Sequence, residues 1–299
     1  MKRILALAAV LLVTIGALYI AQRQTRHDAV SADALVNVAA DWQRDVTRVP
    51  MRLTRISNAE EMEIGNHLAE QYASSGPAAQ TPEERALEQY INEVGGHVAA
   101  HAKRKLVWHF HLLRDHNFIN AFALPGGHIF VGTGLLDQLK TEDELAFVLG
   151  HEIEHVDHYH AVERVQIEAK LRHLDLDIVG QLASIPMSLW QAGYSKDEEF
   201  EADREGLRIA VASGYSAQGA INLLEWWAQL HREYVIHAKT PPDEISQLAI
   251  EGLTGYFRSH PLPSERLART NGVIAEDQLA TNQPLKPFHV EYEVTSGAK

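Results

Sequence analysis

The stretch Gly150-His151-Glu152-Ile153-Glu154-His155 constrains this chain of 299 residues more than any other. In a helix, residues four positions apart lie on the same face, so His151 and His155 can point at one metal ion. Neutral imidazoles suit zinc, and Glu152 is placed to take a proton from a metal-bound water. The stretch indicates a zinc-dependent hydrolase, although the same residues would also fit an ordinary solvated helix face.

A second acidic helix offers the third ligand that a catalytic zinc requires. The chain has no cysteine, so any metal must be held by His, Asp or Glu. Glu199 and Asp203 stand four residues apart on a helix predicted to begin near Lys196, so both carboxylates can face one ion. We predict that Glu199 binds the ion and that Asp203 accepts the second ring N–H of a ligating histidine. The alternative is an acidic face that only keeps the helix soluble.

Apolar periodicity predicts a mostly helical α+β fold with a small β-sheet or hairpin. Alternation from Val107 to Leu113 predicts a half-buried strand. Two apolar runs separated by Pro125-Gly126-Gly127 predict a hairpin or sharp bend within residues 120–131. Thr141 and Glu144 have the spacing of a capping box at the start of the central helix.

The remaining helices follow from similar patterns. They are predicted over residues 57–73, 81–103, 161–191, 196–213, 216–234 and 264–269. Glycine inside a helix costs up to ~1 kcal/mol relative to alanine, so Gly206 suggests that another backbone passes closely there. His158, His160 and Glu201 are predicted to lie on helix surfaces. Phe288 begins a strand-like run in the tail.

The amino terminus indicates export from the cytoplasm. Lys2 and Arg3 precede an uncharged run from Ile4 to Ile20, which is the order of a signal peptide or an uncleaved signal anchor. Membrane association through this run is also predicted as a possibility, because the run just reaches the length that spans a bilayer. The formal charge of -13 argues against nucleic acid as a partner. We therefore predict a signal peptide or anchor over 1–26, a linker over 27–54, a catalytic domain over 55–272 and a tail over 273–299.

Five motifs in the same order resemble the HtpX, LoiP and BepA family of zinc metalloendopeptidases, which is of the CaaX-prenyl-protease type. The motifs are Asn120–Val131, Gly150–His155, Glu199–Arg204, Ser213–Tyr215 and His260-Pro261. The resemblance implies a gluzincin-like metalloprotease domain, with the small β-sheet or hairpin beside the helix that carries His151 and His155, and one zinc ion per chain. It makes His151, His155 and Glu199 the metal ligands, Glu152 the general base, and Asp203 the acid that orients a ligand.

The resemblance also implies how substrate binds. Asn120, Ala121 and Phe122 would belong to an edge strand along which an extended polypeptide pairs through its main chain. His260 would either stabilise the transition state or act as a fourth metal ligand. The implied substrates are misfolded or unassembled proteins of the periplasm or cell envelope. The alternative function is an envelope chaperone or assembly factor that contains zinc and has latent or no proteolytic activity.

Overall fold

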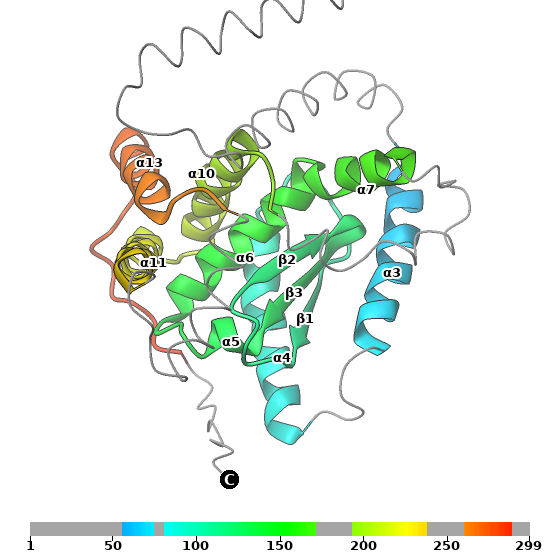
Figure 1. Ribbon diagram of the computed structural model, residues 1–299, viewed down its shortest axis with the longest axis horizontal. Coiled ribbons are helices and arrows are strands. Elements are labelled where there is room, and N and C mark those ends of the chain that lie inside the picture. The colour runs from blue at the N-terminus through cyan, green and yellow to red at the C-terminus, as the bar shows by residue number, and fades with distance from the viewer. Residues whose placement is uncertain (1–55, 75–80, 172–192, 238–259, 289–299) are drawn as a thin grey trace, which may run out of the picture. The chain divides into compact units, whose positions relative to one another are not determined.

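The computed structural model describes residues 56–74, 81–171, 193–237 and 260–288, and these ranges are mostly helical with one small sheet (Figure 1). The predicted α+β class is confirmed. The apolar run 4–20, the predicted linker and the tail beyond Phe288 lie outside the described residues. Within the ranges above, no helix has the length and apolar character needed to cross a membrane.

Eight α-helices are described. They are α3 (Asn58–Ser74), α4 (Pro82–Ala99), α5 (Thr133–Leu136), α6 (Glu142–Asp157), α7 (His160–Leu171), α10 (Lys196–Ala212), α11 (Ala217–His237) and α13 (Pro263–Glu276). The capping box of Thr141 and Glu144 is present at the start of α6. Helix α4 ends before the predicted Lys103, because the backbone N–H groups of Lys103 and Arg104 donate to the Asp157 carboxylate instead of continuing the helix.

The sheet has the order β1-β3-β2 (Figure 1). Strand β1 (His109–Leu113) is parallel to β3 (His128–Gly132), and β2 (Ala121–Leu124) is antiparallel to β3. Gly126 and Gly127 join β2 to β3 with φ of 76° and 98°, a region that side chains disfavour. The predicted hairpin is therefore confirmed, and β2 is an edge strand of the described sheet.

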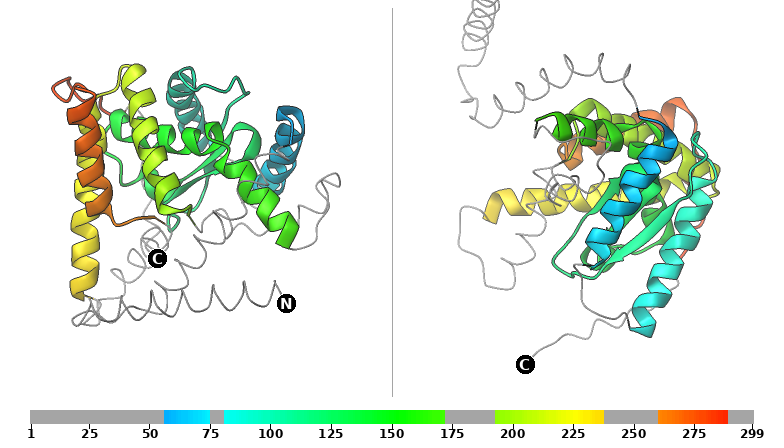
Figure 2. Two further views of the ribbon diagram at one scale, coloured as in Figure 1. Left: turned by 90° about the horizontal axis from the view of Figure 1, so that it is seen from above. Right: turned by 90° about the vertical axis from the view of Figure 1, so that its right-hand side faces the viewer.

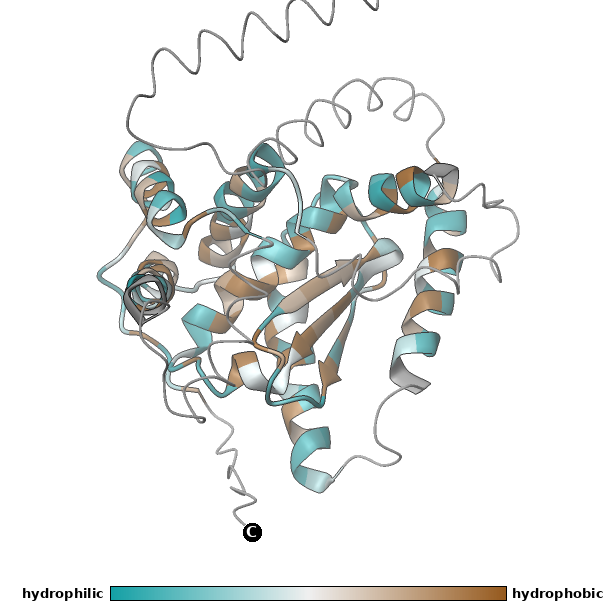
Figure 3. Ribbon diagram, viewed as in Figure 1, coloured by the Kyte–Doolittle hydropathy of each residue, from teal (hydrophilic) through white to brown (hydrophobic). Residues whose placement is uncertain are grey.

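Alternate side chains of the strands enter two hydrophobic cores. On one face, Ala121 and Ile129 join the main core with α4 and α6. On the other face, Phe122 and Phe130 stack with ring centroids 5.1 Å apart and pack with residues of α3 and α7. Figure 3 shows the hydrophobic colouring along the strands between these helices. The sheet thus packs against α6.

Helix α6 is buried along its whole length. The sequence predicted an apolar stripe, with the two histidines on roughly the opposite face, but α10 covers what would be the solvated face. Gly150 and Gly206 make this contact possible: a Cβ on Gly206 would lie 2.6 Å from the Gly150 carbonyl carbon and the His151 nitrogen. The predicted close backbone approach at Gly206 is confirmed. Helices α11 and α13 pack against each other beyond α10 (Figure 2).

Replacing Gly206 with alanine should lower the free energy of unfolding by about 1–3 kcal/mol, because the added methyl meets backbone that cannot rotate away. Urea unfolding would measure this. Gly272→Ala is the matched control, since no atom lies within 4 Å of a Cβ at that exposed helical position. The control should be neutral or stabilising by up to ~1 kcal/mol. Equal stabilities for the two variants would contradict the predicted contact.

Three histidines stack on the face of the sheet opposite α4. The rings of His109 and His111 have centroids 4.7 and 5.2 Å from that of His128. His111 Nε2 lies 2.9 Å from His128 Nδ1, and His128 Nε2 lies 2.8 Å from Asn66 Oδ1. Burial lowers the pKa of His111 to about 4 and that of His128 to about 3, although Glu88 opposes the shift of His111 and neighbouring imidazoles add to that of His128. Both rings therefore stay neutral in the folded protein at physiological pH.

The free energy of unfolding should fall as the pH drops from about 6.5 toward 4. Below the ordinary histidine pKa of about 6.5, the unfolded chain takes up protons that the folded protein does not. Each ring can contribute up to ~1.4 kcal/mol per pH unit. Urea unfolding at several pH values should show a shallower slope for His111→Gln. A wild-type slope in His111→Gln would refute the effect.

Candidate metal centre

Helices α6 and α10 bring three side chains to one point. His151 Nε2 and His155 Nε2 lie 3.1 Å apart. Glu199 Oε2 is 3.5 Å from His151 Nε2, and Glu199 Oε1 is 3.8 Å from His155 Nε2. Ligand atoms around a tetrahedral zinc with bonds of ~2.0–2.1 Å are separated by roughly 3.3 Å. The three side chains are therefore spaced to hold such an ion.

Glu199 fits a cation for a second reason. Its side chain is fully buried, and the Tyr194 N–H donates to Oε1 over 2.9 Å. Oε2 has no hydrogen-bond partner among the residues that the structure describes. Burial alone would raise the pKa of Glu199, but His260 and His151 outweigh it and lower the pKa to about 2. A buried anionic oxygen without a donor needs a positive partner, and a divalent ion would supply one.

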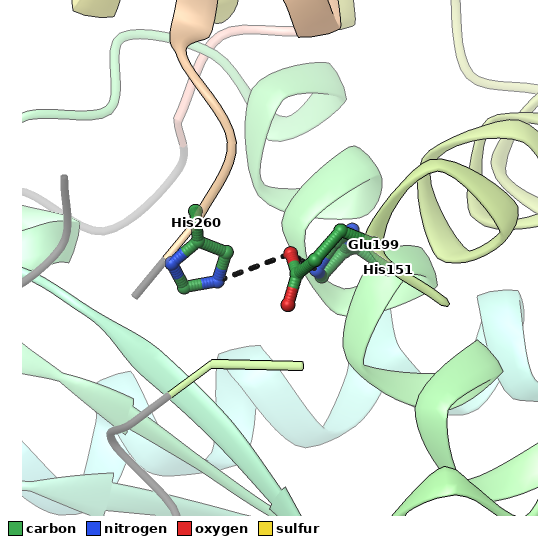
Figure 4. A group of neighbouring side chains, drawn as sticks. All are labelled: His151, Glu199 and His260. Atoms are coloured by element: carbon green, nitrogen blue, oxygen red, sulfur yellow. Dashed lines mark ion pairs between the residues drawn. The ribbon is translucent and has the colours of Figure 1, made fainter. Parts of the chain in front are cut away.

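His260 enters the site from the segment that leads into α13. Figure 4 shows His151, Glu199 and His260 converging from three separate parts of the chain. His260 Nε2 lies 3.6 Å from Glu199 Oε2, and its ring centroid lies 5.9 Å from that of His151. One ligand atom from each of the three residues lies within 4.8 Å of the others. His260 is thus near enough to reach either the metal or a group bound to it.

Asp203 lies behind His151. Its Oδ1 is 3.0 Å from His151 Nδ1, so the carboxylate can accept the Nδ1–H, which would leave the lone pair of a neutral ring on Nε2. Arg266 of α13 donates two hydrogen bonds to the same carboxylate, from Nε over 2.8 Å and from Nη2 over 2.5 Å. Burial opposes ionisation, but Arg266 and His151 hold the pKa of Asp203 well below its usual range.

His160 lies behind His155, which corrects its predicted place on a helix surface. It is 5% exposed, and its Nδ1 is 3.0 Å from His155 Nδ1. The reason is Tyr159, whose φ of 67° interrupts the helix, so that α7 starts at His160 in a new direction. Glu201 is half-exposed and lies against the His160 ring. Burial and the neighbouring imidazoles lower the pKa of His155 well below its ordinary value.

Glu152 is buried beside the three converging side chains. Burial raises the pKa of its carboxyl to about 7, against the opposing effect of His151. Glu152 lines a cavity of about 20 Å³ together with His151, His260, Asn120 just before β2 and Ala121 at its start. The Phe122 side chain points to the opposite face of the sheet. Of the three predicted substrate-binding residues, two therefore border the cavity and one does not.

A known protein family matches more than half of the chain. Residues 82–274 match peptidase family M48. The chain belongs to this family. The match includes α4, the sheet, α6, α10 and most of α13, and all the residues described above at the site lie within it.

Several M48 proteins are similar to the chain. The beta-barrel assembly-enhancing protease of Escherichia coli K12 is 30% identical over 233 residues, which cover 71% of this chain and 43% of that protein. The mitochondrial metalloendopeptidase OMA1 of Schizosaccharomyces pombe is 33% identical over 135 residues, covering 43% and 40% of the two chains. The chain spans less than half the length of these curated relatives.

Three residues beside the predicted ligands were not predicted to belong to the site. Arg266 lies 63 residues from Asp203, and a single arginine in a helix carries no motif. Tyr194 precedes α10, and its ring stacks on His155 with centroids 3.8 Å apart. His160 is the third. Its place could not be read from the sequence, because the positive φ of Tyr159 that turns the chain there is unusual for a bulky residue.

Proposed function

We propose that this chain is a zinc-dependent metalloendopeptidase, with one zinc ion held by His151, His155 and Glu199. The observation that carries the proposal is the convergence of two imidazole nitrogens and a buried carboxylate at the separations of a tetrahedral site. The orientation of His151 by Asp203 supports it, because metal-bound histidines usually donate their second N–H to such a partner.

Glu152 acts as the general base in the proposed reaction. When bound, zinc supplies a Lewis acid and makes a coordinated water more acidic. Glu152 removes a proton from the attacking water, whose oxygen bonds to the scissile carbonyl carbon. It then delivers that proton to the amine as the C–N bond breaks. A carboxyl whose pKa lies near 7 suits both transfers.

The proposed substrates are extended polypeptides. Strand β2 has a neighbour on one side only in the described sheet. Ala121 at its start and the preceding Asn120 border the cavity beside Glu152. Main-chain pairing along Asn120, Ala121 and Phe122 would accept many sequences. The name of the E. coli relative refers to β-barrel assembly, which supports misfolded or unassembled envelope proteins as substrates. We place the protein in the periplasm or cell envelope, with residues 4–20 as signal or anchor.

Zinc content tests the proposal. Purified wild type should hold one zinc ion per chain, and Glu199→Ala should weaken zinc binding by more than the 10–100-fold typical for loss of an outer-shell partner. Asp197→Asn is the control, because it also removes one negative charge from α10 but at an exposed position in the first turn. Equal zinc affinity of the Glu199 variant and the control would reject the ligand assignment.

The position of His260 favours a second candidate, an envelope chaperone or assembly factor with latent or no proteolytic activity. With Nε2 3.6 Å from Glu199 Oε2, His260 can close the ligand shell as a fourth ligand. Casein digestion by wild type and His260→Ala separates the two functions. Activity in either protein supports a protease, and a gain in the variant identifies a latent one. Absence of cleavage by both zinc-loaded proteins would favour the chaperone.

A further inference from the structure

We infer that His160 is a positioning residue which, together with Glu201, sets the protonation of His155 so that its Nε2 lone pair faces the metal. The inference rests on the proposed zinc site. It concerns a contact between two imidazoles rather than the usual contact between an imidazole and a carboxylate. His151 has Asp203 behind it, whereas His155 has His160.

The contacts form a line from the site toward the surface. His155 and His160 are 1% and 5% exposed, and their Nδ1 atoms lie 3.0 Å apart. The other nitrogen of His160, Nε2, lies 3.5 Å from Oε2 of half-exposed Glu201. The carboxylate is thus at the outer end of the line, and the metal-facing Nε2 of His155 is at the inner end.

The positions of the protons follow from these contacts. Two Nδ1 atoms at 3.0 Å can share only one proton, so one ring donates and the other accepts. The Glu201 carboxylate, 3.5 Å from His160 Nε2, favours a proton on that nitrogen, which leaves Nδ1 of a neutral His160 as an acceptor. His155 must then donate its Nδ1–H, and its Nε2 keeps a lone pair. The reverse arrangement would place a proton on His155 Nε2, where the metal is expected.

The same argument bears on a second group of possible metal ligands. His158, His160 and Glu201 bring one ligand atom each to within 4.8 Å of one another. A cation there would take the lone pair of His160 Nε2, so Nδ1 would carry the proton and donate it to His155. His155 would then present a protonated Nε2 to the catalytic site. Zinc in the catalytic site and a cation on neutral His160 therefore compete, and the structure assigns His160 and Glu201 to orientation of His155.

Asparagine at position 160 separates orientation from simple packing. The Oδ1 of asparagine is bonded to Cγ, as is the Nδ1 of histidine, so His160→Asn keeps an acceptor for the His155 Nδ1–H. It removes the Nε2 that faces Glu201. His160→Ala removes both and leaves a buried donor without a partner. We expect zinc to bind about 10–100-fold more weakly to His160→Ala than to wild type, with most of the affinity restored in His160→Asn.

The experiment measures the zinc dissociation constant of full-length protein by competition with a chromophoric chelator. All variants carry Glu152→Gln to prevent self-cleavage. His158→Ala is the matched control, because His158 contacts Glu154 and Glu201 and belongs to the second ligand group. It should leave the affinity unchanged. Nitrogen-15 shifts of the His155 ring in the zinc-free protein give a second readout, with Nδ1 protonated in wild type and in His160→Asn.

Three results would overturn the inference. The first is wild-type zinc affinity in His160→Ala, and the second is equal loss in His160→Ala and His160→Asn, which would indicate packing alone. The third is a second zinc equivalent in wild type that His158→Ala removes, which would show that the cluster binds metal. Failure of the proposed zinc site itself would look different, because the parent protein would then bind no zinc.

Discussion

Glu152→Gln should reduce kcat for peptide hydrolysis by about 10²–10⁴-fold and leave zinc bound. Glutamine has nearly the same shape as glutamic acid but cannot accept the proton of the attacking water. Because Glu152 is buried and its pKa is raised to about 7, replacement by a neutral side chain should not disturb the fold. Casein digestion, together with zinc analysis of the same preparation, measures both parts of the prediction.

Glu154→Gln provides the control on the same helix. Glu154 is also buried but pairs with His158 through Oε2 at 3.1 Å, so its replacement should leave proteolysis close to the wild-type rate. Undiminished proteolysis by zinc-loaded Glu152→Gln protein would exclude Glu152 as the general base. Loss of zinc in that variant would instead show that the carboxylate helps to bind the metal.

Arg266→Leu should lower the free energy of unfolding by about 3–5 kcal/mol. Arg266 is 2% exposed and makes two hydrogen bonds to Asp203, so its loss leaves a buried carboxylate without its charge partner. Urea unfolding of the metal-free proteins measures the change. Zinc binding should also weaken, because Asp203 would no longer be held against His151.

Arg269→Leu is the control for this variant. Arg269 is exposed on the same helix and lies over the Phe200 ring, with its guanidinium carbon 3.8 Å from the centroid. A cation–π contact at an exposed site is worth only ~0.5–1 kcal/mol. The double variant Arg266→Leu/Asp203→Leu should recover stability without recovering zinc binding. If Arg266→Leu and Arg269→Leu lowered the free energy of unfolding equally, the buried ion pair would not be a major source of stability.

Most of the secondary structure could be predicted from local rules. The capping box at Thr141, the positive φ of Gly126 and the close approach at Gly206 all depend on neighbours in sequence or on the size of one side chain, so they could be predicted. The end of α4 could not. It depends on the Asp157 carboxylate, which lies 54 residues from Lys103.

By itself the sequence determined which residue types can hold a metal and which of them share a helix face. His151 with His155, and Glu199 with Asp203, stand four residues apart, and the helical repeat makes such pairs neighbours wherever the helix lies. Because the chain has no cysteine, the sequence also determined that any metal is bound through nitrogen and oxygen atoms. These properties do not depend on how the helices pack.

Only the tertiary structure decided how these pairs meet and what lies behind them. The contact of α6 with α10 at Gly150 and Gly206 brings Glu199 to the two imidazoles, and the break at Tyr159 turns His160 toward His155. Arg266 reaches Asp203 from a distant helix. Such contacts depend on the packing of the whole core, since periodicity constrains a residue relative to its own helix and not relative to another one.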